Sequence, residues 1–404
     1  MQRVLISGAG IGGPALAFWL LRRGLSPTLI ERAPRFRDGG YMIDVWGLGY
    51  ELVERMGLLE AALERAYVID RLAFVDEAGR RVSGFDADAF RRAFMGRFFS
   101  IPRGDLARLV FGAVESHVET LYSTSIEALA QDDSGVDVEL SGGRSRRFDI
   151  VVGADGLRSR VRECVFGGPE RFEKYLGYCA ASFVTRGYPH RDEGSYLSFA
   201  RPGRQISRYA LREDRSAFLL VFAQDERLEI PPHDTAAQKR VLRERFGADG
   251  WECPEILERL DGADDLYFDA VSQIRAPSWS RGRVVLVGDA AYCPSLLAGA
   301  GSAFAMLGAY ALAGEMERAG ANHAAVFAAY ERRLRPFIEE QQKKAVRFAS
   351  SFAPRTALGL SLRNAALGLM RIEPVAAWYS RRMFGSSPDL SSYTQGATSP
   401  SGPS

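Results

Sequence analysis

Three glycines near the start of the chain have the spacing of a phosphate-binding turn. Gly8, Gly10 and Gly13 lie in "GAGIGG", between the apolar run "RVLIS" and the helical stretch "PALAFWLLRRG". In a G-x-G-x-x-G turn the first glycine permits the tight turn, the second lets the backbone approach a pyrophosphate, and the third lets helix and strand pack closely. The next apolar run ends in Glu31, which can accept hydrogen bonds from a ribose diol and would repel a 2′-phosphate. These residues predict a site for NAD or FAD and disfavour NADP.

Two further turns carry carboxylates directly after apolar runs. Asp155 follows "RFDIVVGA" and Asp289 follows "RVVLVG". Ligands of open α/β sheets bind at the carboxyl ends of the strands, where a carboxylate can bind polyhydroxyl groups such as a ribityl chain. A surface turn at Asp155 and a helix N-cap at Asp289 are the structural alternatives. The glycine-alanine loop "CPSLLAGAGSAFAM" follows Asp289, and it indicates either a second nucleotide site or a second contact with one large cofactor.

The composition is that of a globular chain with a sizeable core. The 404 residues are 47% hydrophobic, and the formal net charge of +2 gives no reason to expect binding to nucleic acid or an acidic membrane. The four cysteines and four histidines are scattered without ligand-like spacing, so we expect no metal site and a reducing, cytoplasmic location. The apolar run at 4–21 contains the spaced glycines, so we expect neither a signal peptide nor stable membrane insertion.

The order of predicted elements interleaves two domains. The glycine turn and the strands before Asp155 and Asp289 predict a Rossmann-like domain, and the alternation of aromatic and β-branched residues over 175–225 predicts an antiparallel sheet with one polar face. The fold class is therefore α/β, or α+β overall. We expect the nucleotide domain to comprise 1–70, 100–168 and 272–320, the sheet domain 71–99 and 169–271, the C-terminal helices 321–386, and a disordered tail 387–404.

Three motifs occur in an order and at a spacing that resemble a known enzyme family. "GAGIGG…LIER", "GADGLRSRVR" and "VLVGDAAYCPSLLAGAGSAFAM" are similar to segments of the single-component flavin-dependent aromatic hydroxylases, from residue 3 to about 340. That family has the fold of para-hydroxybenzoate hydroxylase and includes tetracycline-inactivating monooxygenases. The resemblance implies one tightly but non-covalently bound FAD held at both glycine-rich turns, with NAD(P)H as a transient co-substrate that has no domain of its own.

The resemblance also implies which residues bind the cofactor. Glu31 would hold the adenosine ribose with Arg32 beside the AMP half, and Arg103 would contact the ribityl or isoalloxazine region. Asp155 would serve both FAD and the reduced nicotinamide, and Asp289 the ribityl and pyrophosphate region. Along the isoalloxazine would lie Pro294 and the backbone of Gly299, Ala300, Gly301, Ser302 and Ala303.

The last of these segments departs from the family pattern. The family usually reads G-Q-G-x-N there, whereas this chain reads "GAGSA" at 299–303. Backbone N–H contacts to the flavin need only the shape of the loop, so we expect them to persist. Side-chain amide contacts with the flavin or the substrate are not expected.

The function implied by the resemblance is that of an FAD-dependent monooxygenase. It would use NAD(P)H and O2 to hydroxylate an aromatic or polycyclic small molecule through a flavin C4a-hydroperoxide, as a monomer or homodimer. The alternatives are an FAD-dependent oxidase, dehydrogenase or Baeyer–Villiger enzyme of the same fold, and a non-catalytic relative that binds flavin or substrate. A phenolic substrate would be helped by a base. The candidates on the predicted sheet are Arg208, Tyr209 and Tyr196, and a structural place in the sheet is the default interpretation of each.

Overall fold

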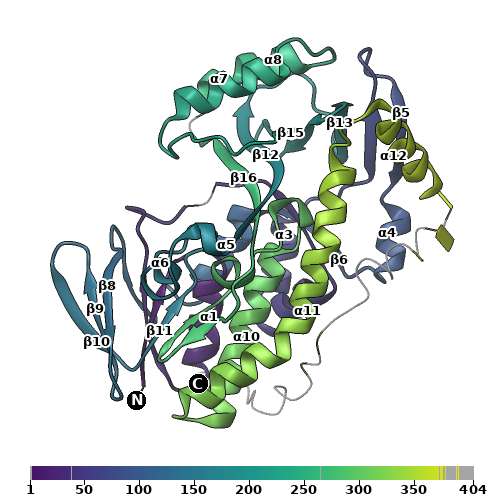
Figure 1. Ribbon diagram of the computed structural model, residues 1–404. Helices are drawn as coiled ribbons and strands as arrows, with labels where there is room; N and C mark the ends of the chain where they lie inside the picture. The colour runs from purple at the N-terminus through teal and green to yellow at the C-terminus, as the bar shows by residue number, and fades with distance from the viewer. Residues whose placement is uncertain are drawn as a thin grey trace.

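Two large sheets and a set of C-terminal helices make up the fold. The computed structural model describes residues 2–37, 39–263 and 265–372, with 374, 375, 378, 388 and 390, and the side chains at 89, 90 and 93 are not described. Figure 1 shows the nucleotide-type sheet in the lower part of the molecule and the second sheet above it. The predicted α/β fold with an antiparallel second sheet and C-terminal helices is confirmed. Apart from 388 and 390, the predicted tail lies outside the described residues.

The six-stranded sheet brings the three motifs together. Its order is β17-β18-β11-β1-β2-β7, and every pair except β17–β18 is parallel. The strands are β1 (Arg3–Ser7), β2 (Ser26–Ile30), β7 (Glu119–Leu121), β11 (Ile150–Gly153), β17 (Ser280–Arg281) and β18 (Val284–Leu286). Since parallel strands end at the same edge of a sheet, the turns after β1, β11 and β18 meet there although they are far apart in the sequence.

Helices α1 (Gly12–Leu21) and α6 (Arg160–Phe166) pack directly on this sheet, and other helices pack beside them. The others are α5 (Arg103–Gly112), α9 (Asp289–Tyr292) and α10 (Gly301–Ala319). Helix α1 is buried along most of its length and packs closely on α10, where a Cβ at Gly12 would lie 3.4 Å from the Cβ of Ala305. This contact fixes the first glycine turn against the start of the helix that follows the 299–303 loop.

The seven-stranded sheet is mostly antiparallel, with order β16-β12-β15-β14-β13-β4-β5 and one parallel pair, β13–β4. Its strands are β4 (Arg71–Val75), β5 (Arg81–Asp86), β12 (Glu173–Arg186), β13 (Ser195–Arg201), β14 (Arg204–Leu211), β15 (Arg215–Ala223) and β16 (Tyr267–Ile274). Strand β16 crosses the expected domain boundary at 271/272. The outer face packs on α7 (Thr235–Phe246) and α8 (Cys253–Arg259) through Phe183, Phe218 and Phe222. The inner face is directed toward the hairpin of β3 (Met42–Trp46) and β6 (Phe98–Pro102).

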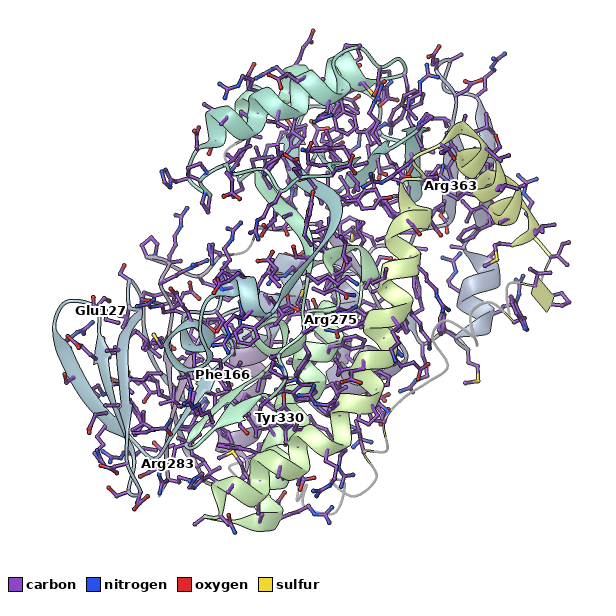
Figure 2. All side chains as sticks on the ribbon, viewed as in Figure 1. Glu127, Phe166, Arg275, Arg283, Tyr330 and Arg363 are labelled. Atoms are coloured by element: carbon purple, nitrogen blue, oxygen red, sulfur yellow. The ribbon has the colours of Figure 1, made fainter. Side chains whose placement is uncertain are left out.

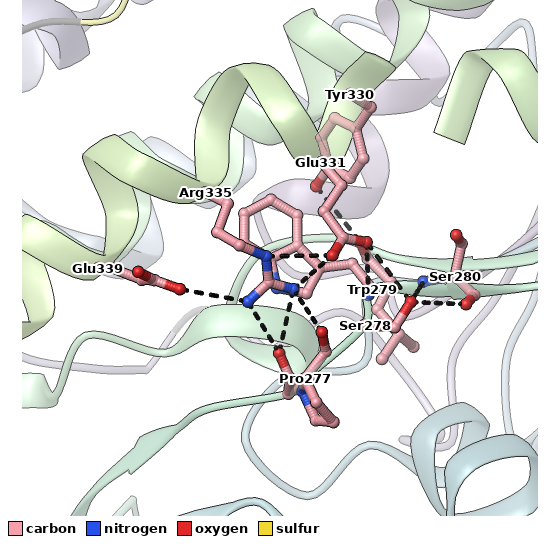
Figure 3. A network of polar contacts seen from close by, with 10 residues as sticks. Pro277, Ser278, Trp279, Ser280, Tyr330, Glu331, Arg335 and Glu339 are labelled. Atoms are coloured by element: carbon pink, nitrogen blue, oxygen red, sulfur yellow. Dashed lines mark hydrogen bonds and ion pairs between the residues drawn. The ribbon is translucent and has the colours of Figure 1, made fainter. Parts of the chain in front are cut away.

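Helix α11 (His323–Phe352) is 30 residues long and runs beside both sheets (Figure 1). Figure 3 shows how it is fastened to the turn before β17: Arg335 donates to the carbonyl of Pro277 (3.0 Å) and pairs with Glu331 (2.5 Å), which accepts from the Trp279 N–H (2.9 Å). One turn away, the Tyr330 hydroxyl lies 2.9 Å from that of Tyr292. The helix therefore binds the chain both before β17 and after β18.

Helix α12 (Ala357–Leu369) packs on β5 and β13 at the far edge of the second sheet. Figure 2 shows Arg363 at this contact, where its guanidinium lies 4.0 Å from the ring centroid of Phe74 and donates to Gln205 Oε1 (2.9 Å). None of the helices in the described part of the chain has the length and hydropathy needed to cross a membrane.

Candidate cofactor and substrate site

The three glycines of the first turn occupy positions with different constraints. Gly8 has φ +109°, and a Cβ there would lie 2.5 Å from the carbonyl oxygen of Ala154, in the turn after β11. A Cβ at Gly13 would lie 1.9 Å from the carbonyl oxygen of Gly8. At Gly10, by contrast, a Cβ would meet only Nη2 of Arg103, at 3.8 Å. Two glycines therefore serve packing, and the third borders open space, as close approach of a pyrophosphate requires.

Glu31 lies directly under the glycine turn. Its carboxylate accepts hydrogen bonds from the N–H groups of Ala9 (3.0 Å) and Ala33 (2.9 Å), and Arg37 approaches it at 3.7 Å. These contacts orient the carboxylate at the end of β2, where a ribose would bind. Arg32 is exposed beside it.

Asp155 has one oxygen in use and one without a partner. Its Oδ2 accepts from the N–H groups of Arg160 (2.9 Å) and Val161 (3.1 Å), which begin α6. Its Oδ1 is buried and accepts no hydrogen bond from the described residues. Burial raises the pKa of the carboxyl group, because the charged form loses solvation. An orphaned buried acceptor beside the Gly8 turn fits a site that a ligand completes.

Asp289 and Arg103 face each other across the carboxyl edge of the sheet. Burial raises the pKa of Asp289, and the positive charge of Arg103 opposes that rise. The Arg103 N–H donates to the carbonyl of Tyr41 (3.0 Å), and a Cβ at Gly301 would lie 3.6 Å from Asp289 Oδ1. The predicted residues Arg103, Asp289 and Gly301 are thus brought together at one place.

The loop from Cys293 to Ala303 keeps a fixed shape although it has no amide side chains of its own. Ser295 has φ +113° and its Oγ accepts from the N–H of Leu297 (3.3 Å), while Gly299 has φ +66°. Two glutamine side chains from other elements hold its start: Gln273 Nε2 donates to the carbonyl of Pro294 (2.9 Å), and Gln342 Nε2 donates to that of Cys293 (3.1 Å). Sequence reasoning missed both glutamines, since nothing in their spacing marks them.

A buried arginine joins the second and third motifs. Arg162 is 2% exposed, and its guanidinium donates to the carbonyls of Ala290 (2.8 Å) and Leu157 (2.7 Å). Burial lowers the pKa of Arg162. Together with the contact of Gly8 against Ala154, this link makes the three sequence motifs one continuous structure.

Comparison with known proteins identifies this structure. The model of the "FAD binding domain" family matches residues 1–345. A protein named flavin-dependent monooxygenase, from an unknown prokaryotic organism, is 33% identical over 375 residues, which cover 92% of this chain and 96% of the relative. The chain belongs to the FAD-dependent monooxygenase family. An uncharacterized protein of Mycobacterium tuberculosis is 39% identical over 85% of this chain and 92% of its own length.

The solved structures agree with this assignment. The tetracycline destructase Tet(51) is 31% identical and covers 92% of this chain and 97% of its own, with a TM-score of 0.78. The predicted family resemblance is confirmed, and the monooxygenase has FAD as its cofactor. The orphaned oxygen of Asp155 and the open space at Gly10 are the features of this chain that fit the cofactor.

The three candidate catalytic residues lie on opposite faces of the second sheet. Tyr196 and Tyr209 stack on the inner face with ring centroids 5.4 Å apart, and the Tyr209 hydroxyl accepts from the N–H of Met42 (2.7 Å). Arg208 alternates to the outer face, where it is buried and pairs with Glu252 (2.5 Å) and Asp192 (2.6 Å). The structure therefore separates Arg208 from the tyrosines and gives it a structural environment.

A second pair of tyrosines, Tyr41 just before β3 and Tyr267 on β16, lies beside Arg103. Tyr41 and Tyr267 meet there edge to face, with ring centroids 5.7 Å apart, and both interact electrostatically with Arg103. Burial raises the pKa of Tyr196, Tyr209 and Tyr267, so these phenols stay neutral at physiological pH. Tyr41, Tyr196 and Tyr267 are half-buried and keep aromatic surface exposed. Tyr209, by contrast, is 2% exposed.

Proposed function

We propose that this monooxygenase hydroxylates an aromatic or polycyclic small molecule, with NAD(P)H as electron donor and O2 as oxygen donor. The pair Tyr41 and Tyr267 carries the proposal, because both rings are half-buried, contact each other and interact with Arg103. Aromatic walls of this kind favour flat apolar ligands. The similarity to Tet(51), a tetracycline destructase, supports a polycyclic substrate.

The cofactor residues are proposed from the same contacts. The space at Gly10 and the N-terminus of α1 would receive the pyrophosphate, and Glu31 the adenosine ribose, with Arg32 beside the AMP half. Asp289 and Arg103 would bind the ribityl region, and the isoalloxazine would lie along Pro294 and the 299–303 loop. Asp155 would use its free oxygen toward FAD or the nicotinamide.

When bound, FAD supplies the electron transfer from the nicotinamide and the activation of O2. The chain supplies orientation and a dry enclosure. Free N–H groups in the first turn of α10, which starts at Gly301 and is 19 residues long, would favour negative charge on the pyrimidine edge of the flavin. Only one nucleotide-binding sheet is present among the described residues, so we infer that the nicotinamide binds transiently.

A second function, flavin or substrate binding without catalysis, is favoured by one observation. The 299–303 segment lacks the two amide side chains of its family. The amides nearest to it along the loop are those of Gln273 and Gln342, which bind the carbonyls of Pro294 and Cys293. If those amides are needed for turnover, the protein binds FAD and does not oxidise NAD(P)H.

Purified holoprotein decides between the two functions. We expect a yellow protein that oxidises NADH or NADPH faster when tetracycline or 2-naphthol is added, with one oxygen atom from labelled O2 appearing in the product by mass spectrometry. FAD binding with no stimulated NAD(P)H oxidation across a panel of phenols and polycyclic compounds would contradict the first function and favour the second. Faster NAD(P)H oxidation that yields only hydrogen peroxide would show that the probe is not hydroxylated.

A further inference from the structure

One face of strand β3 is directed toward the inner face of the second sheet. Its residues alternate, with Ile43 and Val45 buried in the main core and Met42, Asp44 and Trp46 on the other side. Met42 packs with the tyrosine pair on the inner face of the second sheet, so Asp44 lies on the side of β3 that is directed toward that pair.

The Asp44 carboxyl group is accessible. The residue is exposed, and loss of solvation raises the pKa of its carboxyl group while the hydrogen bond from Ser100 opposes that rise. Burial is the main cause of the raised pKa of Tyr196 and Tyr209, and the negative charge of Asp44 adds to it. Asp44 is thus an exposed carboxyl group on the side of β3 that packs, through Met42, on the tyrosine pair.

Asp44 has a single hydrogen-bond donor among the described residues. Ser100, its cross-strand neighbour on β6, donates from Oγ to Oδ1 at 2.5 Å. The other oxygen, Oδ2, accepts no hydrogen bond, and no arginine or lysine lies within ion-pair distance in the described part of the chain. An asparagine would accept the hydrogen bond from Ser100 equally well, so this bond alone does not explain why the residue at this position is an acid.

The chain that follows Asp44 reaches the proposed flavin segment. Helix α2 (Gly47–Arg55) follows β3 directly, and a Cβ at Gly49 would lie 3.1 Å from the Cβ of Ala303. The segment from Met42 to Gly49 therefore extends from the tyrosine pair to the 299–303 loop, and Asp44 is the exposed carboxylate within it.

We propose that Asp44 is a catalytic residue that accepts a hydrogen bond, and then the proton, from a hydroxyl group of an aromatic substrate. In this step the substrate O–H bond breaks, the proton goes to a carboxylate oxygen of Asp44, and the electron pair stays on the substrate oxygen. The added electron density makes the ring a better nucleophile toward an electrophilic oxygen atom. The inference rests on the proposed function and narrows its substrate class to phenols and enols.

A pair of probes of nearly equal size tests the recognition step without turnover. 2-Naphthol can donate a hydrogen bond, and 2-methoxynaphthalene cannot. Each is titrated into the oxidised, FAD-loaded protein and followed by the change in flavin absorbance. We expect wild type to bind the naphthol at least about tenfold more tightly than the ether, since a hydrogen bond to a charged acceptor is among the stronger ones.

Variants assign this preference to the carboxylate. In Asp44→Ala and Asp44→Asn we expect the preference to fall to about threefold or less, with Asn as the variant that preserves the bond from Ser100. The control is Asp86→Asn, an exposed carboxylate on β5 whose two arginine neighbours lie 3.7 Å away, and it should keep the wild-type preference. Equal binding of the two probes to wild type, or no binding of either, would overturn the proposal, as would a preference that survives in both Asp44 variants.

Turnover separates this inference from the function on which it rests. If wild type prefers the naphthol and the Asp44 variants do not, the recognition by Asp44 holds even when no probe stimulates NAD(P)H oxidation. If a phenol is hydroxylated, we expect kcat in Asp44→Asn to fall at least tenfold with the flavin spectrum unchanged, and the acid limb of the wild-type pH profile to disappear. Hydroxylation at the wild-type rate by this variant would overturn the catalytic role.

Discussion

Gly10→Ala and Gly13→Ala are expected to affect different quantities, FAD affinity and folding stability, although the residues are three apart in one turn. A Cβ at Gly13 would lie 1.9 Å from the carbonyl oxygen of Gly8, whereas real Cβ atoms essentially never come within 3.0 Å of another heavy atom. Helix α1 and strand β1 would have to separate by about 1 Å, and overpacking of this kind costs roughly 1–3 kcal/mol or more. At Gly10 the added methyl group meets only the end of a flexible arginine, at 3.8 Å.

The two variants therefore separate folding from cofactor binding. For Gly13→Ala we expect the free energy of unfolding of the FAD-free protein to fall by at least about 1–3 kcal/mol. For Gly10→Ala we expect a change within about 0.5 kcal/mol. Its Kd for FAD should instead rise at least tenfold, about 1.4 kcal/mol, because the methyl group occupies the space proposed for the pyrophosphate.

Urea denaturation of the FAD-free proteins and fluorescence titration with FAD measure the two quantities separately. A Gly13→Ala protein as stable as wild type without FAD would contradict the close packing assigned to Gly13. A Gly10→Ala protein that binds FAD with wild-type affinity would show that the open space at Gly10 has no part in holding the cofactor.

Three further substitutions follow from the site. Asp289→Asn should weaken FAD binding, yet leave the FAD-free protein as stable as wild type or more stable at neutral pH. Burial raises the folded-state pKa of Asp289, so ionisation of this carboxyl group lowers the free energy of unfolding as pH rises through that pKa. Urea titrations at several pH values should therefore show that the free energy of unfolding depends less on pH in the variant. Arg162→Met removes the donor to the buried carbonyl of Ala290 and the part-buried carbonyl of Leu157, and it should lower the free energy of unfolding by about 2–4 kcal/mol in the same assay. Tyr209→Phe removes the acceptor for the Met42 N–H and should lower it by about 1–2 kcal/mol, while the FAD content by absorbance stays unchanged.

The sequence was most informative about features that depend on the backbone, such as a tight turn or a buried strand. The spacing of Gly8, Gly10 and Gly13 predicted a turn whose first and third positions exclude a Cβ, and apolar runs before Asp155 and Asp289 predicted strands that end at one edge. Local sequence determines these features, because a tight turn and a buried strand each depend on residues that are neighbours in the chain. Whether the residues at that edge bind FAD as proposed stays a prediction.

Side-chain partners from distant segments could not be predicted in the same way. Arg208 and Tyr209 are adjacent in the sequence, and only the position of α8 determines that the arginine meets Glu252 on one face while the tyrosine meets Met42 on the other. Asp44 ends the segment "RDGGYMID", which resembles a segment of the family but predicts no chemical role for the acid, and its surroundings form only when β3 lies against the second sheet. Gln273 and Gln342 were missed because an isolated glutamine carries no spacing signal.

The interleaving of the two sheets has a consequence for the order in which the newly synthesised chain can fold. Strand β4 pairs with β13, and β11 must wait for β18, so neither sheet can acquire its full set of neighbours until most of the chain has left the ribosome. Until then the free edges of β4 and β11 offer unpaired backbone groups to other chains. Contacts between residues so far apart in sequence also make folding slow. The early strands thus need protection during synthesis. FAD, whose proposed contacts extend from Gly8 to Ala303, can stabilise only a chain that is nearly complete.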